Sequence, residues 1–266
     1  MSLNNLIKVA AALIMLAATS AFAAPHAAIV VEPSSGNVLH AENHDMRLHP
    51  AGLTKLMTLY TAFSAIKNGE VRLDDSVLIS KNAAFEPPVK LGLREGQKIK
   101  LRYLIRAIGI QGANDASTAL GAHIAGSEDA FAKRMQVYSD ELGLTKSNWR
   151  NQHGRTASQH LSTARDIASL LIALKLDFPD YYNLFRRLSE DAGLRQVKHS
   201  ASRLLIAIPG ITGGKYGYTR AAGFSAAVSV KRRGREIVVV VIGAPSTASL
   251  VERVERLTDS AFKKIN

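Results

Sequence analysis

Three short segments of this chain carry side chains that could do chemistry in a cleft: Gly52-Leu53-Thr54-Lys55, Gly112-Ala113-Asn114 and Lys215-Tyr216-Gly217. Lys55 follows Gly52 by three residues at the expected start of a helix, so positions 52 and 55 share one helix face. An amine placed there could take the proton of a hydroxyl at position 52 and turn it into a nucleophile. Glycine has no hydroxyl, so the base position is filled and the nucleophile position is empty.

No nearby hydroxyl is expected to replace the missing one. Thr54 lies two residues further along the helix and faces another direction. Tyr216 offers only a phenol, which is a poor nucleophile at neutral pH. His153 lies in a loop with no serine or acid at an informative spacing. A structural role for this histidine is therefore favoured over a catalytic one.

The nitrogen-bearing residues of the three segments each leave two interpretations open. Lys55 could bind a ligand or pair with a buried acceptor. Asn114 could hold a ligand or cap the helix that follows it. Lys215 could bind a carboxylate or serve no ligand at all. The segments are expected to meet in one groove, with Lys55 and Lys215 on two of its walls and a positive potential inside.

Residues rich in β-formers stand at both ends of the chain. Expected strands cover 27–31, 38–41, 74–80, 215–219, 224–230 and 236–242. The run 237–242 is continuously apolar, which predicts a central strand covered on both faces. We expect it to lie beside the strand that holds Lys215.

Helical periodicity dominates the middle of the chain. Apolar residues recur at spacings of three and four from Leu53 to Ile66, which predicts a buried helix beginning at Gly52, and Asn68-Gly69 ends it. Further helices are expected over 101–110, 117–124 and 167–174, after Ser127 and after Ser246, while Pro179 is expected to end the middle region. This order predicts an α+β fold, in which helices flank an antiparallel sheet and an all-helical lobe is inserted.

The first 23 residues have the features of a secretory signal peptide. Lys8 is followed by the apolar run 9–18 and by Ala21-Phe22-Ala23, a small-x-small cleavage site. The apolar run is short of the roughly 20 residues that span a bilayer, which disfavours a transmembrane anchor. We therefore expect export to the periplasm and one domain over 24–266. Cysteine is absent, so no disulfide framework supports the fold.

The chain of 266 residues carries a formal net charge of +12. An exported basic protein meets anionic envelope polymers, so their binding is one possible function. Nucleic acid is a poor fit, because the basic residues are dispersed and no nucleic-acid motif occurs. The one tight basic run, Lys231-Arg232-Arg233, is interpreted as a solvated hairpin turn.

The three segments, in this order and spacing, resemble the marks Ser-x-x-Lys, Ser-x-Asn and Lys-Thr-Gly of penicillin-recognising serine enzymes. The closer resemblance is to D-alanyl-D-alanine carboxypeptidases, the low-molecular-mass penicillin-binding proteins with a serine β-lactamase-like fold. It extends over six stretches, namely 50–58, 113–116, 124–131, 151–154, 162–166 and 217–224. The resemblance, carried by six stretches in the right order, spans nearly all of the chain after the signal peptide.

The resemblance implies a role for each mark. A serine at the position of Gly52 attacks the D-Ala-D-Ala peptide bond, and Lys55 is its base. A serine at the position of Gly112 assists proton transfer, while Asn114 holds the substrate amide. Lys215 and a threonine in the next position bind the substrate carboxylate. No metal or other cofactor is implied.

This chain departs from the family pattern at every mark. Gly52 and Gly112 replace the two serines, and Tyr216 replaces the threonine before Gly217. Each mark has thus lost its aliphatic hydroxyl. Removing the nucleophile alone from a serine protease lowers kcat by about six orders of magnitude.

Three functions compete on this basis. The favoured one is an exported carboxypeptidase-like protein of peptidoglycan metabolism that has lost catalysis and binds a stem peptide or a cell-wall protein. The alternatives are an active serine-type D-Ala-D-Ala carboxypeptidase and a basic module that binds anionic envelope polymers. The family often adds a β-domain and an anchor helix, and neither is expected here because the chain ends after the closing helix.

Overall fold

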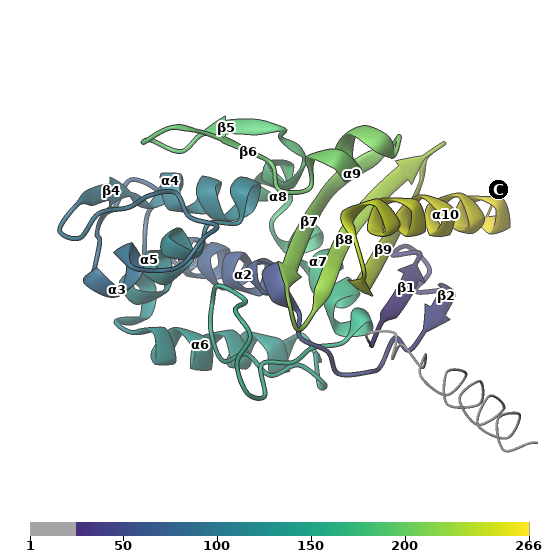
Figure 1. Cartoon of the computed structure of the whole chain (residues 1–266), viewed down its shortest axis with the longest axis horizontal. Helices are drawn as coiled ribbons and strands as arrows, with labels where there is room; N and C mark the ends of the chain where they lie inside the picture. The colour runs from purple at the N-terminus through teal and green to yellow at the C-terminus, as the bar shows by residue number, and fades with distance from the viewer. Residues whose placement is uncertain (1–24, 266) are drawn as a thin grey trace, which may run out of the picture.

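A five-stranded antiparallel sheet forms the centre of the computed structural model, which describes residues 25–265. The expected signal peptide lies outside these residues. The strand order is β2-β1-β9-β8-β7 (Figure 1). Its strands are β1 (Ala27–Val31), β2 (Val38–Glu42), β7 (Ile211–Thr219), β8 (Gly223–Arg232) and β9 (Arg235–Ala244). Both ends of the described chain therefore build the same sheet, as predicted.

Strand β9 lies in the middle of the sheet, and its alternating side chains enter two different cores. Val238, Val240 and Ile242 belong to the large core on the face of the sheet that α7 (Ala164–Asp177) covers. Val239 and Val241 belong to the smaller core beneath α10 (Thr247–Ile265). The prediction of a strand covered on both faces is confirmed. Its expected place beside the Lys215 strand is wrong, because β8 lies between β9 and β7.

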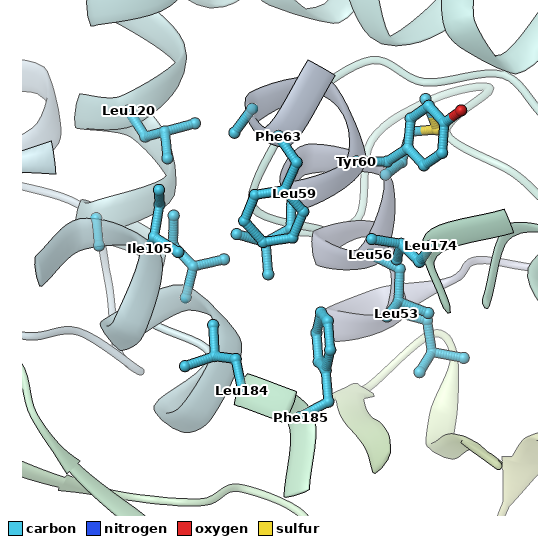
Figure 2. Close-up of a cluster of buried hydrophobic side chains, with 14 of the residues drawn as sticks. Leu53, Leu56, Leu59, Tyr60, Phe63, Ile105, Leu120, Leu174, Leu184 and Phe185 are labelled. Carbon is cyan, nitrogen blue, oxygen red and sulfur yellow. The ribbon is translucent and has the colours of Figure 1, made fainter. Parts of the chain in front are cut away.

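Helix α2 (Thr54–Lys67) is the axis of the large core, and a 3-10 turn over Ala51–Leu53 precedes it. Twelve of its fourteen residues are buried, because α7 and the helices over 107–111, 114–125 and 128–141 pack around it. Figure 2 shows Leu56, Leu59 and Phe63 of α2 pointing into the cluster that Phe185 closes from another segment. Burial on all sides fixes the start of α2 against the sheet.

The inserted lobe lies between β2 and β7 in the chain. Its helices are α3 (Lys81–Ala84), α4 (Leu101–Arg106), η2 (a π-helix, Ala107–Gln111), α5 (Asn114–Ala125), α6 (Glu128–Glu141), α7 (Ala164–Asp177), α8 (Pro179–Tyr182), η3 (a 3-10 helix, Asn183–Arg186) and α9 (Ser202–Ala207). Two small hairpins complete it, β3 (Ser76–Leu78) with β4 (Lys98–Lys100) and β5 (Ser189–Asp191) with β6 (Gln196–Lys198).

Several helix boundaries differ from the predictions, and α7, for example, begins at Ala164 rather than at 167 and ends at Asp177 rather than at 174. The helix expected over 101–110 changes to π-helical geometry at Ala107. Helix α5 begins at Asn114 rather than at 117, and Pro179 begins a short helix instead of ending the region. Proline is well suited to a first helical turn, which lacks hydrogen-bond acceptors for its N–H groups. Among residues 25–265, no helix has both the length and the apolar character needed to cross a bilayer.

Candidate functional site

A cleft of about 350 Å³ opens where the start of α2, the edge strand β7 and the turn between η2 and α5 meet. Six of the seven predicted site residues line it, namely Gly52, Lys55, Gly112, Asn114, Tyr216 and Gly217. The cleft is completed by Pro88, Val89, Gln111, His153, Gly154, Arg155, Ser200, Tyr218 and Thr219. The three segments singled out in the sequence thus converge on one site.

The backbone of β7 packs directly on Gly52. A β-carbon at this position would lie 2.7 Å from the carbonyl oxygen of Tyr216 and 2.9 Å from the Cα of Gly217. Both distances are too short for real atoms, and both neighbours are backbone rather than a movable side chain. The preceding residue, Ala51, has φ +49°, a left-handed conformation that costs an alanine about 1–2 kcal/mol. Position 52, just before α2, is therefore crowded by backbone atoms and also lacks a hydroxyl group.

Lys55 is buried, and its ammonium group binds other parts of the protein. Its Nζ donates a hydrogen bond of 2.8 Å to Oδ1 of Asn114 and another to the backbone carbonyl of His153. Burial lowers the pKa of Lys55 to about 7, while the negative charges of Glu86 and Asp115 oppose this shift. The amine is thus partly neutral near physiological pH, and it links α2 to α5 and to the His153 loop.

Asn114 uses its whole amide group in structural contacts. Its Oδ1 accepts from Lys55, and its Nδ2 donates to the carbonyls of Pro87 and Pro88 at 3.0 and 3.2 Å. The capping interpretation is wrong, because Asn114 is the first residue of α5 and Ala113 occupies the cap without a side-chain bond. The asparagine instead holds the 87–88 loop at the rim of the cleft.

Lys215 lies beneath the lining of the cleft and not on its surface. Its side chain is completely buried, and its Nζ donates to the carbonyls of Ile108 and Gly109 in η2, the latter at 2.8 Å. Burial moves the pKa of Lys215 well below its usual range, and the charge of Lys55 adds to the shift. The expectation that Lys215 forms an open wall of the groove is therefore wrong, although its role toward a ligand stays a prediction.

Tyr216 and Tyr218 lie on the opposite face of β7 from Lys215, because side chains alternate along a strand. Tyr216 packs at the edge of the core beneath α10. Tyr218 is 51% exposed, and its ring lies 4.4 Å from that of Phe224, measured between centroids. Since β7 is an edge strand, both tyrosines also line the cleft. The aromatic side of the site is thus separate from its lysines.

Glu86, Glu128 and His153 form a group beside the cleft in which one ligand-type atom from each lies within 4.8 Å of the others. Nδ1 of His153 accepts from the N–H of Arg155 at 3.2 Å, which assigns the proton to Nε2. Nε2 in turn lies 3.6 Å from Glu86 and 3.9 Å from Glu128. A protonated nitrogen cannot ligate a metal. Burial lowers the pKa of His153 to about 3, so we assign this neutral histidine a structural role.

Gln111, Ser200 and Tyr218 line the cleft but were missed in the sequence. Gln111 and Tyr218 each stand directly beside a recognised segment, so their position in the chain could have drawn attention to them. No pattern in the sequence indicated that Ser200 would lie in the cleft. It reaches the cleft because its backbone N–H donates to the carbonyl of Ile110, which fastens the segment before α9 to η2.

The fold and the cleft define a penicillin-binding-protein-like molecule. The described chain superimposes on penicillin binding protein 5 from Haemophilus influenzae with a TM-score of 0.85 and 28% sequence identity, over 89% of this chain and 70% of that one. It superimposes on the D-alanyl-D-alanine carboxypeptidase DacD from Francisella tularensis with a TM-score of 0.84 and 25% identity, over 89% and 70% of the two chains.

The sequence gives the family directly. Residues 15–246 match the D-alanyl-D-alanine carboxypeptidase family, and the chain belongs to this family of peptidoglycan metabolism. It is 31% identical to the carboxypeptidase DacF of Bacillus subtilis over 89% of this chain and 62% of that protein. It is 32% identical to DacC of Escherichia coli over 88% and 60%. The chain thus spans about three fifths of the length of these relatives.

Proposed function

We propose that this protein is an exported, non-catalytic member of its family that binds peptidoglycan, through its stem peptide or another part, without cleaving it. The observation that carries the proposal is the contact between Gly52 and β7. A nucleophile must project from position 52 into the cleft, and the backbone of Tyr216 and Gly217 occupies the space of its first carbon. Loss of the serine and approach of the strand together remove covalent chemistry at this position.

The remaining motif residues support the same conclusion. Lys55, Asn114 and Lys215 each direct their polar atoms to other parts of the protein. A group that assists proton transfer must offer a lone pair or a hydrogen that the substrate can reach. Here these residues join α2, α5, η2 and the 87–88 loop into one frame around an open cleft. A preserved cleft without a nucleophile at position 52 suits binding.

Incubation with purified peptidoglycan sacculi tests binding and catalysis in one experiment. The protein is expected to sediment with sacculi and to release no D-alanine from them, with an active carboxypeptidase as the positive control for release. Catalytic release of D-alanine would overturn the loss of catalysis. Failure to sediment at any protein concentration would overturn peptidoglycan binding and leave a scaffold for a cell-wall protein.

A further inference from the structure

Two polar atoms on the floor of the cleft have no hydrogen-bond partner among the described residues. They are Oε1 of Gln111 and Oγ of Ser200, and both are buried. Gln111 immediately precedes Gly112, and Ser200 lies near the same glycine from another segment. Buried polar atoms normally find a partner, so unpaired atoms that line a cleft indicate where a ligand binds.

The space above Gly112 connects these two atoms to Lys215. A β-carbon on Gly112 would lie 3.7 Å from Nζ of Lys215 and 4.0 Å from Oγ of Ser200, with no described atom nearer. The Lys215 amine already gives two hydrogens to Ile108 and Gly109. The amine nitrogen has one further position for a hydrogen bond. This position is an N–H when the amine is charged and a lone pair when the amine is neutral. The Gly112 space therefore adjoins an amine that has one position left.

The Gly112 space suits a hydroxyl group better than a carboxylate. Nε2 of Gln111 donates weakly to the carbonyl of Lys90 at 3.4 Å, which leaves Oε1 as the acceptor on the cleft side. A carboxylate only accepts, so it would leave this Oε1 unpaired and would repel a neutral Lys215 amine. A hydroxyl has one hydrogen and two lone pairs, so it can donate to Oε1 of Gln111 while it accepts from Oγ of Ser200 and from a charged Lys215.

The exposed ring of Tyr218 adds an apolar surface at the rim of the cleft. Tyr218 is half exposed, packs against the ring of Phe224 and follows Gly217 on β7. A large aromatic ring with an exposed face offers apolar contact area at low cost in conformational entropy. The C–H face of a sugar ring fits such a surface, while its hydroxyls require the polar floor.

We propose that the cleft holds an amino-sugar ring of the glycan strand, with one hydroxyl above Gly112 and one ring face against Tyr218. This inference rests on the proposed function, since it names the part of peptidoglycan that the cleft receives. It differs from the expectation of a stem-peptide carboxylate, because a carboxylate has no hydrogen to donate to the unpaired Oε1 of Gln111.

The two ligand classes can be separated by NMR titration of the protein with three probes. These are a peptide-free disaccharide of N-acetylglucosamine, an acyl-D-Ala-D-Ala peptide and a disaccharide-pentapeptide. The disaccharide is expected to shift the amide signals of Gly112, Ser200 and Tyr218, and the combined probe is expected to bind at least as well. The peptide alone is expected to leave these signals unchanged.

Two variants and their matched controls locate the sugar. Tyr218→Leu is expected to weaken disaccharide binding about two- to tenfold, the range of one aromatic contact. Ser200→Ala is expected to weaken it by a similar factor. Leu176→Ala, at a side chain 73% exposed on α7, and Ser202→Ala, at a neighbour outside the cleft, are expected to have no effect.

Each unfavourable outcome has a distinct meaning. Shifts from the peptide but not from the disaccharide would overturn the glycan assignment and leave the proposed function intact. Disaccharide binding that neither Tyr218→Leu nor Ser200→Ala weakens would place the sugar elsewhere and overturn the assignment too. Absence of binding to all three probes and to sacculi would overturn the proposed function itself.

Discussion

The two glycines that were predicted to stand at the family's serine positions are each fitted to the surrounding backbone. Gly52 allows β7 to approach within the space of a missing β-carbon. Gly112 has φ +82°, a conformation that glycine adopts freely and that an L-residue pays for with strain. Restoring either hydroxyl therefore means moving backbone as well as changing a side chain.

Gly52→Ser is expected to destabilise the fold by about 1–3 kcal/mol, the usual cost of inserting atoms into a packed site. Urea unfolding of the variant and of Gly52→Ala measures this loss. Alanine serves as the matched control, because it adds the crowded β-carbon without the hydroxyl. Equal losses would agree with crowding by β7, whereas unchanged stability of both variants would contradict the contact.

His160 is expected to make the protein less stable in acid. Its ring is buried, with Nε2 bonded to Oγ1 of Thr54 at 2.8 Å and Nδ1 accepting from the N–H of Arg150 at 2.9 Å. Burial lowers the pKa of His160 from 6.5 to about 4, helped by the charges of His49 and Lys55. Between these two values the unfolded chain binds a proton that the folded protein does not. Stability therefore falls as the pH drops through this window, by about 1.4 kcal/mol per pH unit.

The variant His160→Gln isolates this proton. Urea unfolding between pH 6.5 and 4 should show a shallower fall in unfolding free energy for the variant, by close to one proton. Parallel slopes for His160→Gln and the parent would show that His160 is not neutral in the fold.

The π-helix η2 depends on a strand that lies more than a hundred residues further along the chain. Lys215 of β7 donates to the carbonyls of Ile108 and Gly109. The N–H groups of Gly112 and Ala113 both donate to the carbonyl of Ala107 at the other end of the turn. A π-helix leaves some backbone carbonyls without a donor from its own turns. The buried amine of Lys215 donates to two of them.

Lys215→Met is expected to loosen η2. The change leaves two buried carbonyls unpaired, at a cost of about 1–3 kcal/mol for an unpaired buried group. Hydrogen exchange at Gly112 and Ala113 should become faster than in the parent protein, while exchange in β9 should change only with global stability. Lys231→Met, at an exposed lysine of β8, is the control. Unchanged exchange at both amides would contradict the proposed role of Lys215 in holding η2.

Only the site residues that belong to the three sequence segments could be predicted from the sequence. The spacing of Gly52 and Lys55 on one helix, and the order of the three segments, were sufficient to bring six residues to one cleft. Burial of Lys215 could not be predicted, because it depends on the carbonyls that η2 turns toward β7. The position of Ser200 depends on a single backbone bond to Ile110 that no local pattern indicates.

At the scale of the whole molecule, strong periodicity decided which elements were predictable. The apolar run 237–242 and the helical pattern of α2 are long and unambiguous, so the sheet and its central helix followed. The hairpin of β5 and β6 was missed because its strands are three residues each and bury one apolar side chain, Val197. The hairpin of 224–230 with 236–242 across the basic turn was expected and is confirmed as β8 and β9. The second hairpin, which pairs β7 with β8 and so separates β7 from β9, had no comparable signal in the composition.

Charge distribution sets the expected response to salt. The chain has a net charge of +12, but the proposed sugar contacts are the uncharged side chains of Gln111, Ser200 and Tyr218 and the buried amine of Lys215. Binding to sacculi should therefore weaken less than about threefold between ~0.05 and ~0.5 M sodium chloride, whereas binding driven by exposed charges is strongly screened over this range. The double variant Lys231→Ser and Arg233→Ser, in the β8–β9 turn, should bind like the parent. A steep loss with salt would instead favour a module for anionic polymers.

The central claim is that the family's cleft is preserved here without its covalent chemistry. Intact-mass spectrometry of the denatured protein after incubation with excess benzylpenicillin tests it most directly, with an active relative treated in parallel. The account predicts an unchanged mass, because β7 occupies the space beside Gly52 and Lys55 is bonded to Asn114. A stoichiometric gain of one penicillin, prevented by a competing β-lactam, would contradict it.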